Sequence, residues 1–90
     1  MNETRRKAIS VTLDKIIKAQ ELLEDIQSDI DCVSFNEQMA RDNIPERLQA
    51  TERYEKCDAA CDNLDTAANS IDDALQSLQE VSDALEYASE

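Results

Sequence analysis

The chain has 90 residues, with no glycine, a single proline and three aromatic residues. This composition does not supply the turns of a sheet protein, so an all-α fold is expected. The net charge of −12 argues against direct binding to nucleic acid or to anionic membranes, because an acidic surface repels both.

The first predicted element is a helix over residues 4–41. Apolar residues recur there at spacings of three and four, which is the helical period. They are Ile9, Leu13, Ile16, Ala19, Leu23, Ile26, Ile30 and Val33, with Ile17 and Leu22 widening the stripe. No helix breaker occurs before Arg41, so we expect one continuous helix.

A turn is predicted at residues 42–44. Asn43 is a good N-cap, and Glu46 three residues later completes a capping box. Pro45 fits the first helical turn, where its missing N–H is no loss. We therefore expect the second helix to begin near Ile44 and to run to about residue 88. A connection this short makes the two helices antiparallel neighbours.

The second helix repeats apolar residues every seven positions. The three series are Leu64, Ile71, Leu78 and Leu85; Ala60, Ala67, Ala74, Val81 and Ala88; and Cys61, Ala68 and Leu75, ending in Ser82. Three apolar positions per heptad make a stripe that two helices do not bury alone. We expect a single hairpin over residues 1–90 that associates with itself into a homo-oligomeric helical bundle.

Charge is distributed unevenly along the chain. Residues 1–18 carry five basic and two acidic residues, whereas residues 19–40 hold six carboxylates and residues 57–90 hold nine, both without a base. Antiparallel pairing would set Arg5, Arg6 and Lys7 beside Asp83, Glu86 and Glu90, and Cys32 roughly opposite Cys57. The carboxylates are typical of a solvated helix face. Alternatively, the row formed by Asp58, Asp62, Asp65, Asp72 and Asp83 mimics a DNA backbone.

Groups suited to catalysis or metal binding are sparse. The chain has no histidine, no phosphate-cradling glycines and no nucleophile–base pair, so we expect neither an enzyme nor a cofactor. Three cysteines without histidine fall short of a zinc site, and Asp72 and Asp73 lack a calcium-binding loop. The odd cysteine count and the lack of a long apolar run favour the cytoplasm.

The hairpin tip is the candidate ligand site. Inward-facing positions there turn polar, at Glu37 on the first helix and at Arg47, Arg53 and Tyr54 on the second. One interpretation is an Arg53–Glu37 ion pair. The other is an anion site, because arginines suit phosphates and a tyrosine ring suits a nucleobase. Its candidate residues are Arg41, Asn43, Arg47, Gln49, Arg53 and Tyr54.

The stretch Asn43-Ile44-Pro45-Glu46-Arg47-Leu48-Gln49, followed by Glu52-Arg53 and heptads of Leu and Ala, resembles a group of small acidic helical-hairpin proteins encoded by phages and prophages. This resemblance covers the tip and the second helix. It implies a phage accessory protein in the host cytoplasm and assigns no activity.

Three functions remain open for such a protein. The first is a counter-defence sponge that sequesters a small anionic nucleotide signal at the tip. The second is an acidic inhibitor that mimics DNA or plugs the groove of a basic host defence protein. The third is a structural scaffold.

Overall fold

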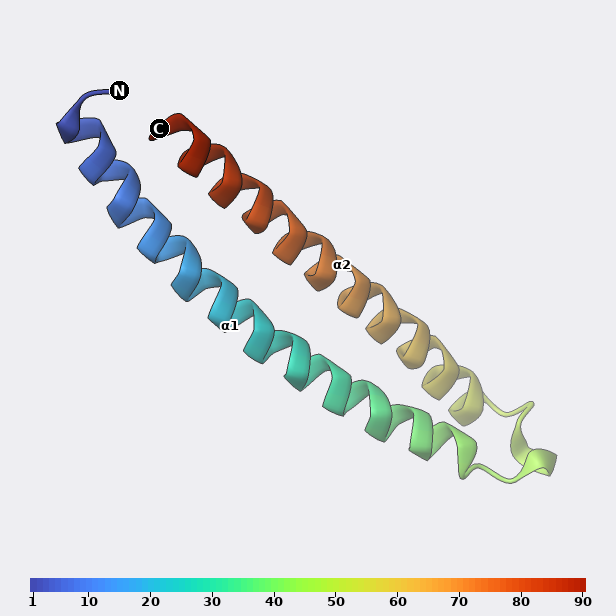
Figure 1. The fold of residues 1–90 in the computed structure, drawn as a ribbon. Helices are drawn as coiled ribbons and strands as arrows, with labels where there is room; N and C mark the ends of the chain where they lie inside the picture. Colours follow the sequence, from blue (N-terminus) through green and yellow to red (C-terminus); the bar gives the residue numbers. More distant parts are fainter.

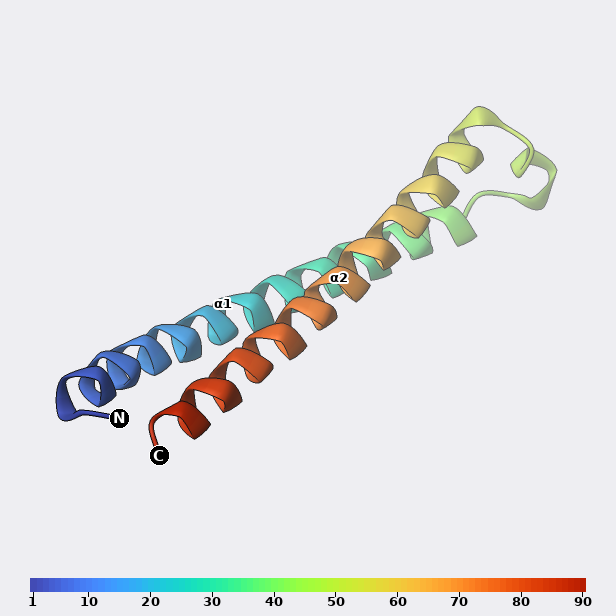
Figure 2. The ribbon, with the colours of Figure 1, turned by 90° about the horizontal axis from the view of Figure 1, so that it is seen from above.

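The computed structural model describes residues 1–90 as a hairpin of two long helices (Figure 1). Helix α1 spans Glu3–Asp42, a single 3₁₀ turn η1 spans Glu46–Leu48, and α2 spans Glu52–Ala88. The helices run antiparallel along a rod of 69 × 15 × 13 Å, and both chain ends lie together opposite the tip (Figure 2). The predicted all-α antiparallel hairpin is confirmed. Neither helix contains a stretch apolar enough to span a bilayer.

The start of α2 differs from the sequence-based prediction. Asn43 is the C-cap of α1, and its N–H donates to the Met39 carbonyl at 3.0 Å. The predicted capping box with Glu46 is therefore wrong. Ile44 is only 5% exposed, and Pro45 takes an extended ψ of 143°. A residue before proline avoids the helical region, so the chain cannot continue as helix at Ile44.

The N-cap of α2 is Thr51. Its hydroxyl accepts a hydrogen bond from the Tyr54 N–H at 3.5 Å and donates one to the Leu48 carbonyl at 2.6 Å. Glu52 and Glu55 follow in the first turn, where the positive end of the helix dipole stabilises their carboxylates. The loop between the helices thus includes residues 43–51 and is longer than predicted.

A narrow seam between the helices forms the core. Only Ile16, Ser34, Ile44 and Cys61 are buried. On α2, the predicted series of Leu64 and of Cys61 line the seam and are buried or half-buried. On α1, the seam passes through Ser34, whereas Val33, predicted to face inward, is 53% exposed. Steps of four and three from Ile30 lead to Ser34 and Glu37, which keeps the seam turned toward α2.

Three polar pairs cross one side of the seam. Gln20 Nε2 donates to Gln79 Oε1 at 3.3 Å, Gln27 donates to Asp72, and Arg41 Nη1 donates to Asp58 Oδ1 at 3.0 Å. We call these six residues the polar ladder. Its members are separated by seven and by fourteen residues on each helix, which are whole multiples of the heptad. Polar groups at seam positions fix the register of paired helices, because any slip leaves them unpaired.

The ends of the two helices meet through Arg6, but none of the predicted basic residues forms an ion pair with Asp83, Glu86 or Glu90. Arg6 donates from Nε to the Ser89 carbonyl at 3.1 Å and from Nη2 to the Glu90 carbonyl at 3.3 Å. Its cationic side chain thereby satisfies carbonyls at the C-terminal end of α2 that have no helical partner. The prediction that Cys32 lies opposite Cys57 is wrong. The register of the polar ladder places Cys57 level with about Asp42, ten residues further along α1, and Cys32 is exposed.

Candidate binding surfaces

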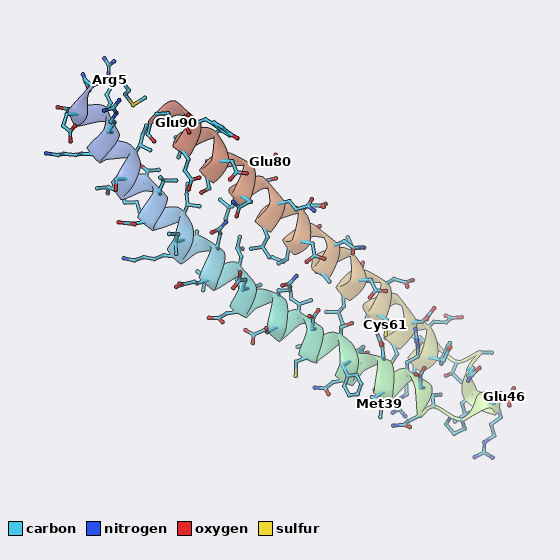
Figure 3. All side chains as sticks on the ribbon, in the orientation of Figure 1. Arg5, Met39, Glu46, Cys61, Glu80 and Glu90 are labelled. Carbon is cyan, nitrogen blue, oxygen red and sulfur yellow. The ribbon has the colours of Figure 1, made fainter.

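The tip presents most of its candidate residues to solvent. Asn43, Arg47, Gln49 and Arg53 are exposed, and Tyr54 is half-buried at the start of α2. Figure 3 shows Glu46 at this end of the rod and Arg5 and Glu90 at the opposite end. No cavity opens among the tip residues. In the single hairpin the tip therefore holds no pocket for a ligand.

Arg41 differs from the other tip arginines because it forms ion pairs within the hairpin. Its Nε lies 3.3 Å from Asp42 Oδ1, and its Nη1 lies 3.0 Å from Asp58 Oδ1. These hydrogen bonds, to Asp42 first and then to Asp58, raise the pKa of the Arg41 guanidinium. Arg41 thus belongs to the polar ladder, and its charge is already paired with carboxylates within the hairpin.

Arg47 and Arg53 have no carboxylate partner. The ion pairs of the molecule join Arg41 to Asp42, Arg41 to Asp58, and Lys56 to Glu52. The Arg53–Glu37 pair considered from the sequence does not form. Two guanidinium groups therefore remain free at the tip of a chain that contains 21 acidic residues.

Two thiols occupy the seam just below the tip. Cys61 is 2% exposed and Cys57 is half-buried. Burial raises the pKa of both thiols, and the nearby carboxylate of Glu37 raises that of Cys57 further. Buried neutral thiols pack as small apolar groups. No group of three or more potential metal ligands is present.

The cavity of the hairpin lies at the end opposite the tip. It is open, about 320 Å³ in volume, and lined by Asp83, Glu86, Tyr87 and Glu90. Three carboxylates beside an aromatic ring form a surface that favours a cationic group. This cavity was not predicted from the sequence. The available signal was the spacing of Asp83 and Glu86, three residues apart on one face of α2, with Glu90 just beyond its end.

The fold and these surfaces define the class of protein as an acidic all-α helical hairpin with two unpaired arginines at its tip. No known protein family, curated protein or solved structure was found that matches the chain.

Proposed function

We propose that this protein acts by stoichiometric binding, with the carboxylates of α2 engaging a basic surface of a protein partner. The observation that supports this most is the number of unpaired carboxylates. Of 21 acidic residues, only Asp42, Glu52 and Asp58 take part in ion pairs. The remaining carboxylates are available to meet a partner's lysines and arginines.

The arrangement of these groups favours a groove-binding inhibitor. The carboxylates of α2 beyond Asp58 are all exposed, and of these only Asp72 is bonded to α1, through Gln27. A helix holds them in fixed positions along a rod 69 Å long, so little entropy is lost when a partner binds. The cavity at Asp83, Glu86 and Glu90 adds a place for one cationic side chain. Complementary charge would speed encounter and reject acidic partners.

The partner proposed here is a basic host defence protein that normally grips DNA. This choice rests on the resemblance of the tip motif to phage and prophage proteins and on the acidic surface. The hairpin would occupy the DNA-binding groove and block it without chemistry.

A competition assay tests the proposal. Purified bacterial nucleases and DNA-binding defence proteins are mixed with labelled duplex DNA, and displacement by the hairpin is followed by fluorescence anisotropy. We expect displacement from at least one of them at near-equal stoichiometry. Raising salt from 50 to 300 mM should weaken the complex steeply, because its contacts are between charges.

Matched variants locate the surface. One replaces four exposed carboxylates of α2, by Asp62→Asn, Asp65→Asn, Asp73→Asn and Glu80→Gln, and should lose displacement. The control makes the same charge change on α1, by Glu21→Gln, Glu24→Gln, Asp25→Asn and Asp31→Asn, and should retain it. Equal loss in both variants, or no displacement from any protein tested, would contradict the proposal.

A second candidate function is capture of a small anionic nucleotide at the tip. It is favoured by the free guanidinium groups of Arg47 and Arg53 beside the half-buried Tyr54. Calorimetric titration with a panel of cyclic and ADP-ribose-type nucleotides tests it. Arg47→Ala with Arg53→Ala should abolish binding, and Lys7→Ala with Lys18→Ala should not. Absence of heat at high protein concentration removes this candidate.

We also propose that the hairpin acts as a homo-oligomer. The molecule exposes 6651 Å², whereas a compact monomer of 10.1 kDa exposes about 5,300 Å². The excess, roughly 1,300 Å², exceeds the ~800 Å² that each partner contributes to a standard interface. Several large apolar side chains contribute to it, among them Val11, Ile17, Leu22, Val33, Phe35 and Met39.

A further inference from the structure

One flank of the hairpin is almost free of charge. On α1 it comprises the residues reached from Ala8 by alternating steps of four and three up to Ala40, which we call the α1 stripe. On α2 it comprises those reached from Ala60 by alternating steps of three and four up to Ala88, the α2 stripe. Each residue advances about 100° around a helix, so both stripes stand on the flank opposite the polar ladder.

The two stripes differ from the rest of the surface in composition. A third of the chain is charged, and residues 57–90 alone hold nine carboxylates, yet the α2 stripe contains no charged residue. It consists of small side chains, apart from Val81. The α1 stripe contains Leu22, 61% exposed, and Val33. A flank that combines exposed apolar groups with small uncharged ones allows close approach of another helical surface.

Lys15 and Asp29 are the only charged residues on this flank. Both are exposed, and neither forms an ion pair within the hairpin. They lie seven residues before and seven residues after Leu22, which is about two helical turns in each direction. Their signs are opposite, so the α1 stripe is complementary to itself when it is reversed end over end.

We infer that a second copy of this chain docks on this flank, antiparallel, with the twofold axis near Leu22. Leu22 then lies at the centre, and Lys15 of each copy comes within about one turn of Asp29 of the other. A parallel arrangement would instead set Lys15 against Lys15 and Asp29 against Asp29. The charges therefore select the antiparallel arrangement. The twofold repeats each contact, as an isologous interface requires.

The position of Leu22 along the rod agrees with this antiparallel arrangement. Leu22 is at the middle of α1, which spans Glu3–Asp42, so reversal about Leu22 overlaps the two α1 helices over their full length. Both tips then project from opposite ends of the dimer, with Arg47 and Arg53 still accessible. The carboxylates of α2 lie off the stripe and stay in solvent. The inference rests on the proposed self-association and specifies its surface and geometry.

Charge exchange between the two positions tests the geometry in the full chain. Sedimentation equilibrium measures the dimer Kd of the wild type, Lys15→Glu, Asp29→Lys, and the double variant. Each single reversal places like charges together twice per dimer and should raise Kd about tenfold. The double variant restores opposite charges and should return Kd to near the wild-type value. The two single variants change the net charge in opposite directions. A general effect of net charge would therefore change their Kd values in opposite directions, whereas the proposed contact raises both.

Two further variants complete the experiment. Asp31→Lys makes the same charge change as Asp29→Lys outside both stripes and should leave Kd unchanged. Leu22→Glu places two carboxylates at the twofold and should abolish the dimer, while circular dichroism confirms that the helices remain. A dimer that is indifferent to Leu22→Glu, or single reversals that the double variant does not rescue, would overturn the antiparallel geometry. A wild type that is monomeric at millimolar concentration would overturn self-association as well.

Discussion

Cys61 shows how burial determines the chemistry of a single side chain. It is the least exposed residue of the hairpin, and Cys57 one turn away shares the seam with Glu37. Removal from water disfavours the thiolate, so the pKa of each thiol is raised. The third cysteine, Cys32, stays exposed on α1. Packing in the seam therefore protects two of the three thiols from reaction.

Stability should decline at alkaline pH because of these two thiols. Their pKa is raised on folding, so their contribution is fully present below the ordinary value of 9.0 and is lost as pH rises through the raised value. Urea unfolding at pH 7.5, 9 and 10 should show the free energy of unfolding falling above pH 9. In the variant Cys57→Ala with Cys61→Ala the fall should be shallower. An identical fall in both proteins would show that other groups cause it.

The beginning of α2 illustrates competition between two capping signals. Asn43 and Thr51 both have side chains suited to an N-cap. Ile44 is buried, and residues 43–45 lie outside both helices. Thr51 is therefore the residue that caps the N-terminus of α2. The side chain of Asn43 makes no hydrogen bond as the C-cap of α1, where only its backbone N–H is used.

Substitution of the two residues should therefore have unequal effects. Thr51→Ala removes the cap of α2 and should lower the free energy of unfolding by about 1 kcal/mol. Asn43→Ala should change it by less than about 0.5 kcal/mol. Thermal and urea unfolding followed by circular dichroism measure both. The reverse order of effects would mean that the second helix begins at residue 44.

Electrostatic repulsion acts on the molecule as a whole. The net charge is −12, and only three ion pairs offset it. Such an excess destabilises a folded chain through self-repulsion. Screening shortens the reach of this repulsion, from about 30 Å at 0.01 M salt to about 8 Å at 0.15 M. The exposed ion pairs lose little, because each contributes only ~0–1 kcal/mol.

Salt should therefore raise the thermal stability of the hairpin. At fixed protein concentration, the Tm should increase between 10 and 300 mM NaCl. A gain of about 1 kcal/mol corresponds to a shift of roughly 4–8 °C for a chain of this size. The α1 variant with four neutralised carboxylates should show a smaller increase. A Tm that falls with salt would indicate that attractive pairs, and not repulsion, dominate.

The sequence by itself determined the two helices, their antiparallel arrangement and the α2 side of the seam. Spacings of three and four persist from Ile9 to Leu85 with one interruption near Pro45, and a signal repeated over so many turns is not altered by one local contact. Arg6 lies at the C-terminal end of α2 because the two helices are antiparallel and similar in length.

Only the tertiary structure decided which residue at a given level of the rod faces the other helix. Ser34 lies in the seam where Val33 was predicted, Arg41 forms an ion pair with Asp58, and Ile44 is buried at the tip. The free state of Arg47 and Arg53 and the acidic cavity at Glu86 were decided in the same way. Such pairings join residues far apart in the chain, and their energies depend on register, which a local pattern does not contain.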